Sequence, residues 1–339
     1  MALFSKDLGI DLGTMNTRLA DSTQVLLNEP TIVAIEVDAD RVAEKMVAVG
    51  EEALNMYGRV PENIEVARPL KNGVIADYVI TEALLSYLLQ QVSGSMRIFR
   101  PRVMLSVPYG VTSVERRAVY EAAREAGSRE AYLIQQSLAA ALGIDLPINA
   151  PSGNMVISLG GGATEASVMA MYGIVSAETL RAGGQDFDEA ISIYIRRKYG
   201  VTIGQQTAEK LKIKIGAAVP QDQEQSMEVQ GQDQVTGLPR PIMITTGEIV
   251  EALQDPLKNV IETGRRVLEK TPPELVSDII DRGVALCGGG ALLRGIDKLL
   301  TKELGIPAYL VDNPLTCVVE GTVRGLELHS VLERNLPKV

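Results

Sequence analysis

The sequence contains no tryptophan and very little phenylalanine, cysteine or histidine, with 3, 2 and 1 copies among 339 residues. Its two cysteines, Cys287 and Cys317, are too few for the disulfide framework that stabilises many small secreted domains. The single histidine, His329, has no other histidine or cysteine clustered near it, so a zinc site is not expected. These shortages exclude a disulfide-rich scaffold and argue against zinc chemistry.

Long hydrophobic runs and an excess of basic residues are also missing. No apolar stretch reaches transmembrane length and no signal peptide is visible, so we expect a cytoplasmic protein. The 33 basic and 43 acidic residues give a formal net charge of −10. An acidic surface disfavours nucleic acid as a partner, and it requires any contact with an anionic membrane to be local.

The remaining composition is that of an ordinary globular protein, with 46% hydrophobic residues and enough length for about two domains. Strand-like runs alternate with helical patterns, which predicts an α/β fold with mixed sheets covered by helices on both faces. Residues 221–241 are polar and predict an exposed hairpin. Helix boundaries are expected at the Thr112–Glu115 capping box, Gly127, Ser137, Asp186, Tyr199, Thr207, Gly216, the Thr245–Glu248 capping box, Pro256 and Thr271.

A turn after the first apolar run carries the main chemical signal. In the segment Leu8–Thr17, an apolar strand leads into Asp11, Gly13 and small hydrogen-bonding residues. A glycine lets the backbone approach a ligand closely, and the N–H groups around Thr14 and Asn16 can form an anion-binding nest. Asp11 can hold Mg²⁺ through water, because Mg²⁺ prefers few carboxylates and retained waters. The turn therefore predicts a phosphate site.

The same plan occurs twice more. Residues 154–165 repeat it with Ser158 in the place of Asp11, and residues 283–293 have a strand and glycines without a carboxylate. A single glycine-rich turn is more often an ordinary tight turn, but three in one chain favour a nucleotide site. Two similar halves that each offer a phosphate turn predict a nucleotide held in a cleft between them.

Several segments of the chain resemble the MreB family of bacterial actins, within the actin, Hsp70 and sugar-kinase superfamily. The resemblance runs from Asp7 to about Leu328, with this chain as a divergent member. The segments that carry it are Asp11–Thr17, Val74–Tyr78, Val114–Ala118, Pro151–Met155 and Thr271–Ile280.

The resemblance implies an actin-like (ribonuclease H-like) fold of two related domains around an ATP–Mg²⁺ cleft. The subdomains it implies are residues 1–32, 66–148 and 315–339 (subdomain IA), 33–65 (IB), 149–184 and 245–314 (IIA), and 185–244 (IIB). It also implies head-to-tail filaments, with paired protofilaments, that bind the inner face of the cytoplasmic membrane and work with cell-wall synthesis and shape proteins.

Carried over by position, the resemblance assigns the nucleotide site. It implies a first phosphate loop, a second phosphate loop, a helical segment at the ribose and adenine, and a turn on the adenosine side. Without the resemblance, the helical segment would be interpreted as a solvated helix face. The residues are, in that order, Asp11, Gly13, Thr14, Met15 and Asn16; Gly160, Gly161 and Gly162; Glu209, Lys210 and Lys212; and Gly288, Gly289, Gly290 and Ala291. The catalytic candidates are Asp11, Gln136, Ser158 and Thr164.

The sequence departs from the family at two catalytic positions. Gln136 replaces the glutamate that orients or activates the attacking water, and Ser158 replaces the aspartate that begins the second loop. Ala163 also replaces a threonine, although Thr164 remains. Asp11 is left as the only clear acidic residue at the γ-phosphate end. Phosphoryl transfer depends mostly on positioning and electrostatics, so we expect ATP binding with slow hydrolysis.

Two short apolar segments are candidates for membrane contact. Leu3 and Phe4 precede the first strand, and Ile98 and Phe99 lie among arginines in a loop. Apolar side chains flanked by cations suit insertion at an anionic bilayer interface. The alternative is that the aromatic side chains pack under neighbouring loops.

Two other functions remain open. A sugar kinase or polyphosphate phosphatase of the same fold would need a carboxylate base, which Gln136 and Ser158 do not supply. A monomeric, chaperone-like nucleotide switch is the other alternative, although no peptide-binding domain is visible. Because fold does not fix function, the choice depends on the matched motifs.

Overall fold

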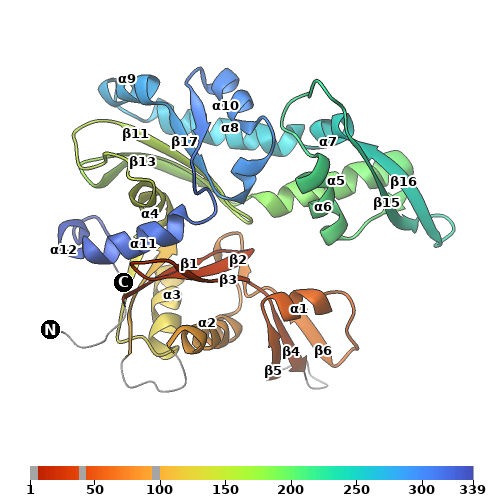
Figure 1. The fold of residues 1–339 in the computed structure, drawn as a ribbon, viewed down its shortest axis with the longest axis horizontal. Coiled ribbons are helices and arrows are strands. Elements are labelled where there is room, and N and C mark those ends of the chain that lie inside the picture. Colours follow the sequence, from red (N-terminus) through yellow and green to blue (C-terminus); the bar gives the residue numbers. More distant parts are fainter. Residues whose placement is uncertain (1–6, 38–42, 94–99, 339) are drawn as a thin grey trace. The chain divides into compact units, whose positions relative to one another are not determined.

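The computed structural model describes residues 7–37, 43–93 and 100–338, which form two compact units. The first unit comprises the residues up to Ser152, Met169–Val175 and those from Leu315 onward. The second comprises Gly153–Val168 and Ser176–Pro314. Figure 1 shows the elements of both units.

The first unit is built on a five-stranded sheet with the strand order β10-β9-β1-β2-β3. Strands β1, β9 and β10 run parallel, whereas β2 is antiparallel to both β1 and β3. Figure 1 shows this sheet between two layers of helices. The bounds of the strands are β1 (Asp7–Leu12), β2 (Asn16–Ala20), β3 (Val25–Pro30), β9 (Arg102–Val107) and β10 (Glu130–Gln135).

Alternate residues of β1 face these two helical layers, as the two-residue period of a strand requires. Leu8 and Ile10 are fully buried in the core that includes α2 (Tyr78–Ser93) and α3 (Ser113–Glu125). Gly9 faces the opposite way, where it lies against α11 (Cys317–Glu327). The prediction of helices on both faces is therefore confirmed for this sheet.

The second unit repeats this plan. Its five-stranded sheet has the order β18-β17-β11-β12-β13, with β11, β17 and β18 parallel. In each sheet, the central strand, β1 or β11, is followed by a glycine turn and then by a neighbouring strand. The two related halves expected from the repeated segments are therefore present. The strands are β11 (Asn154–Leu159), β12 (Thr164–Ala170), β13 (Gly173–Leu180), β17 (Val284–Cys287) and β18 (Ala308–Leu310).

Smaller sheets extend each unit. A three-stranded sheet, β5-β4-β6, lies in the chain between β3 and α2, and another, β14-β15-β16, lies between α5 and α7. They overlap the residues expected for subdomains IB and IIB, although β6 and β16 each extend past the expected end, and the four subdomain boundaries remain a prediction. The bounds are β4 (Val33–Val37), β5 (Ala43–Val49), α1 (Glu51–Met56), β6 (Ile64–Ala67), β7 (Leu70–Lys71), β8 (Val74–Ile75), α5 (Gly184–Tyr199), β14 (Val201–Thr202), β15 (Ser226–Asp233), β16 (Pro239–Thr245) and α7 (Thr246–Ala252).

The remaining helices complete the two cores. In the second unit, Val260, Ile279 and Leu300 from three different helices pack with strand residues Ile157 and Leu286. No helix among the described residues is long and apolar enough to cross a membrane. The bounds are α4 (Gln136–Gly143), α6 (Gln205–Ile215), α8 (Gln254–Glu269), α9 (Pro273–Arg282), the 3₁₀ helix η1 (Gly289–Leu292), α10 (Ile296–Leu304) and α12 (His329–Leu332).

Several predicted boundaries are confirmed. The capping boxes begin α3 and α7, residues 226–245 form the expected hairpin, and the helix around Pro256 is split into α7 and α8.

Three predicted caps are wrong. Ser137 lies inside α4, whose N-cap is Gln135, and it is fully buried. Asp186 accepts the Gly183 N–H from within α5, so the helix begins earlier. Thr271 donates its hydroxyl to Val267 O at 2.7 Å at the end of α8, and Pro272 is the N-cap of α9.

Helices α4 and α11 meet backbone to backbone. A Cβ added to Gly321 would lie 1.7 Å from Ala139 O, and one added to Gly143 would lie 1.8 Å from Cys317 O. Neither position can accept a side chain unless the helices separate.

We therefore expect Gly321→Ala to destabilise the protein by roughly 3 kcal/mol or more, because the added methyl forces the helices apart. Urea unfolding of the purified protein measures the change. Gly204→Ala is the matched control, since a Cβ at Gly204 meets no atom within 4 Å. A Gly321→Ala variant as stable as the control would contradict the packing described.

Candidate functional site

The first glycine turn lies between β1 and β2. A Cβ at Gly13 would lie 2.6 Å from Asn16 O, so the turn depends on glycine. Thr31 Oγ1 donates to Gly13 O at 2.7 Å, and Thr31 N donates to Met15 O at 2.8 Å. Neighbouring segments therefore hold the carbonyl side of the turn.

Two further donors contact oxygen atoms of the turn, whereas some of its own N–H groups are unused. Arg68 Nη1 donates to Met15 O at 3.3 Å, and Gly73 N donates to Thr14 Oγ1 at 2.9 Å. Within the described part of the chain, the N–H groups of Thr14 and Met15 donate to no protein atom. Adjacent unused N–H groups can receive an anion.

Asp11 lies directly before this turn, at the end of a buried strand. Ser106 Oγ donates to Asp11 Oδ1 at 2.7 Å, and Arg18 Nη1 lies 3.6 Å from Asp11 Oδ2. Burial raises the pKa of the Asp11 carboxyl, while Arg18 and the Ser106 hydrogen bond act in the opposite direction. Gln136, the other catalytic candidate here, is the first residue of α4 and follows β10 at the same sheet edge.

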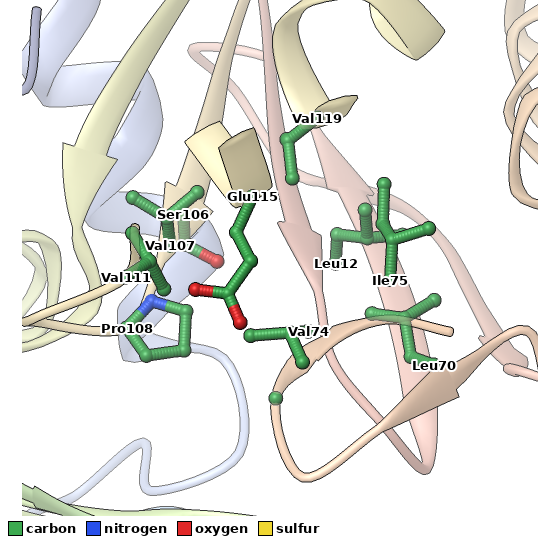
Figure 2. Close-up of a pocket in the computed structure, with 11 residues that line it drawn as sticks. Leu12, Leu70, Val74, Ile75, Ser106, Val107, Pro108, Val111, Glu115 and Val119 are labelled. Atoms are coloured by element: carbon green, nitrogen blue, oxygen red, sulfur yellow. The ribbon is translucent and has the colours of Figure 1, made fainter. Parts of the chain in front are cut away.

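A narrow pocket lies beside these strand ends. Figure 2 shows the Glu115 carboxylate directed towards Pro108 and Val74, among aliphatic side chains. Glu115 Oε2 accepts the Thr112 N–H at 2.7 Å, so it also caps α3. Walls this apolar do not suit a polyphosphate. The lining residues are Leu12, Leu70, Gly73, Val74, Ile75, Ser106, Val107, Pro108, Val111, Glu115 and Val119.

The second glycine turn, Gly160–Ala163, is held by the start of α5. Gly184 N donates to Gly160 O at 2.9 Å, and Gln185 N donates to Gly161 O at 2.8 Å. A Cβ at Gly183 would lie 2.5 Å from Gly160 O. The turn and the helix N-terminus therefore form one rigid backbone assembly.

The polar side chains beside this turn are buried. Ser158 is 1% exposed, and its hydroxyl has no hydrogen-bond partner among the described residues. Thr164 Oγ1 donates to Ala182 O at 3.0 Å. Neither residue supplies a carboxylate.

Helix α6 presents the predicted Glu209–Lys212 pair next to α5. Lys212 Nζ donates to Gly184 O at 2.8 Å and lies 2.7 Å from Asp188 Oδ1, in an ion pair without the alignment of a hydrogen bond. Glu209 and Lys212 are half-buried, whereas Lys210 is exposed. Lys212 therefore lies beside the second glycine turn, and Lys210 points to solvent.

The third glycine turn follows β17. Gly288 has φ +84°, and a Cβ there would lie 2.4 Å from Leu159 O, so Gly288 lies against the end of β11. Arg294 Nε donates to Gly216 O at 3.0 Å, which joins this turn, with Gly289, Gly290 and Ala291 in η1, to the end of α6. The second unit thus brings together the second turn, the third turn and α6.

The sequence analysis did not identify five residues that contribute to the candidate site, namely Arg18, Ser106, Asp188, Gly184 and Arg294. Arg18 could have been found by counting the hairpin register, since Asp11 and Arg18 are directly opposed across β1 and β2. The others depend on contacts between elements distant in sequence. Leu3, Phe4, Ile98 and Phe99 lie outside the described residues, so membrane contact stays a prediction.

The comparisons with known proteins agree with this arrangement. The crystal structure of MreB 5 of Spiroplasma citri bound to AMPPNP superimposes on this chain with a TM-score of 0.90. The two sequences are 34% identical, and the match covers 98% of each chain. A MamK double helical filament structure has a TM-score of 0.81 at 20% identity, over 96% of this chain and 99% of that chain, and supports the fold alone. The fold is therefore actin-like, as expected.

Sequence comparison gives the family. The family model described as MreB/Mbl protein matches residues 5–334. The cell shape-determining protein MreB of Escherichia coli (strain K12) is 47% identical over 328 residues, which is 96% of this chain and 94% of that protein. The Mbl protein of Bacillus subtilis (strain 168) is 43% identical over 94% of this chain and 95% of its own. The chain belongs to the MreB/Mbl family.

The buried Asp188 carboxyl should make the folding stability of the protein depend on pH. Burial raises the pKa of Asp188 from 3.8 to about 6, against the lowering effect of Lys212, and nearby Glu209 raises it further. A carboxyl whose pKa is higher in the folded state binds more protons there, so folding stability falls as pH rises from about 4 to 6.

We expect Asp188→Asn to be more stable than the unsubstituted protein at pH 7.5, by roughly 2–3 kcal/mol, with the difference vanishing near pH 4. Urea unfolding across this pH range, without nucleotide, measures it. Asp222→Asn, at an exposed residue, is the control. A difference that does not change with pH would show that ionised Asp188 carries no such cost.

Proposed function

We propose that this protein is an ATP-binding subunit of a cytoskeletal filament that determines cell shape at the inner face of the cytoplasmic membrane. The observation that carries the proposal is the repeated architecture, in which two sheets of one strand order each place a glycine turn after the central strand. Structures of a relative bound to AMPPNP and to ADP support nucleotide binding, and the cell shape-determining relatives support the cytoskeletal role.

Each glycine turn has a proposed part in binding ATP. The unused N–H groups of Thr14 and Met15 suit a phosphate, and Gly160, Gly161 and Gly162 form the second phosphate turn. The turn at Gly288–Ala291 and the α6 residues Glu209 and Lys212 suit the adenosine and ribose. Support comes from the contacts that join the last two groups within the second unit.

The chain offers few carboxylate ligands for the expected Mg²⁺. Asp11 is engaged by Ser106 and Arg18, and Ser158 stands where a second acid was expected. No group of three or more His, Cys, Asp or Glu that could hold a metal occurs among the described residues. When Mg²⁺ accompanies ATP it would supply charge neutralisation at the phosphates, held mainly by phosphate oxygens and water.

Slow hydrolysis is part of the proposal. An amide at Gln136 can orient water but cannot accept its proton, and the buried Ser158 hydroxyl is not a base. Thr164 already donates to Ala182 O. Contact with the membrane through Leu3, Phe4, Ile98 and Phe99, and with cell-wall synthesis proteins, is proposed from family membership.

Restoring both acids should speed hydrolysis. We expect Ser158→Asp combined with Gln136→Glu to raise steady-state phosphate release by about tenfold or more, because a positioned carboxylate supplies a general base. Gln223→Glu, an exposed position, is the control for added charge. Equal rates in all three proteins, or a fast unsubstituted protein, would contradict the assignment of slow hydrolysis to these two positions.

Filament formation distinguishes the proposal from a small-molecule kinase and from a monomeric switch. Negative-stain microscopy should show filaments with ATP, and fewer or none for Gly160→Ala, because a Cβ there would lie 2.7 Å from Ala163 O and distort the phosphate turn. Gly204→Ala should polymerise normally. Absence of filaments from the unsubstituted protein with ATP, on and off anionic liposomes, would refute the filament proposal.

A further inference from the structure

Arg18 lies in a row of polar side chains that crosses the first sheet. Asp11 on β1 opposes Arg18 on β2, and Ser106 on β9 donates to Asp11 from the other side. Only 13% of the Arg18 side chain and 8% of the Asp11 side chain are exposed. The guanidinium is therefore a largely buried, permanently charged group on β2, three residues after the last residue of the first glycine turn.

Arg18 has hydrogen-bonding capacity that the described residues do not use. A guanidinium has five N–H donors, and the ion pair engages Nη1 with Asp11 Oδ2 at 3.6 Å, longer than a hydrogen bond. Arg18 Nε is buried and has no partner among the described residues. A buried donor without a partner is costly, which indicates that a ligand completes the site.

The surroundings favour a phosphate over a metal ion. Side chains alternate across a strand, so Asp11 and Arg18 lie on the face that Gly13 and Asn16 share. A divalent cation at Asp11 would be repelled by the guanidinium, whereas the unused donors match phosphate oxygens. The free N–H groups of Thr14 and Met15 add further donors at the same turn.

We propose that Arg18 binds the phosphates of the nucleotide directly and neutralises their charge, so that tight binding does not require a divalent cation. This inference rests on the proposed nucleotide binding. Asp11 then acts as a positioning residue that holds the guanidinium, and Ser106 orients Asp11.

Calorimetry of ATP binding to the full chain, in excess MgCl₂ and in EDTA, tests the proposal. The affinity of the unsubstituted protein should differ less than about threefold between the two conditions. Arg18→Gln should bind about thirtyfold more weakly in EDTA and should recover much of this loss with Mg²⁺, because Asp11 is then free to attract the ion. A purely structural role would not produce recovery by metal.

Two further variants complete the test. Arg18→Gln with Asp11→Asn leaves no unpaired buried charge, so it should fold, bind weakly in EDTA and gain little from Mg²⁺. Arg117→Gln removes the same charge from a side chain that is 72% exposed and should bind as the unsubstituted protein does. Thermal melting verifies that each variant is folded.

Different results would contradict the role of Arg18 and the proposed nucleotide binding. Binding by the unsubstituted protein that depends on Mg²⁺ as strongly as binding by Arg18→Gln would overturn this inference alone. So would Arg18→Gln binding ATP in EDTA as tightly as the unsubstituted protein. No ATP binding by the unsubstituted protein in either condition would overturn the proposed nucleotide function, and this inference with it.

Discussion

Close approach of backbone to backbone at the glycine turns is the constraint on which the candidate site depends. At Gly13, Gly160, Gly183 and Gly288, an added Cβ would come within 2.4–2.7 Å of a carbonyl oxygen. Because the carbonyls are packed inward or bonded, the turns have fixed shapes before any ligand arrives. Pre-organised turns need little reorganisation on binding, so more of the interaction energy appears as affinity.

The same constraint explains what could be predicted from sequence. A short apolar run that ends in glycine carries its own signal, so all three turns, the paired sheets and the hairpin at residues 226–245 could be anticipated. Pro256 marked the split between α7 and α8 because proline lacks an N–H and fits the first turn of a helix. These features depend on residues close together in sequence.

The features that escaped prediction are set by distant contacts. Asp188 and Lys212 pair only because α5 packs on α6, and Arg294 reaches Gly216 only in the folded unit. The start of α5 was predicted wrongly for a local reason. Gly183 and Asp186 together begin α5, so the side chain that satisfies the cap lies inside the helix instead of before it.

Near the glycine turn of each unit, a largely buried basic side chain faces an aspartate. In the first unit Arg18 faces Asp11, and in the second Lys212 faces Asp188. Both units thus contain a cation–carboxylate pair, which comes from neighbouring strands in the first unit and from neighbouring helices in the second. In such a pair the carboxylate offsets only part of the cost of removing the cation from water. A phosphate that approaches either turn gains only the difference between its own attraction and that of the aspartate. In the proposed function, Asp11 and Asp188 therefore reduce the attraction of these two cations for a polyanion.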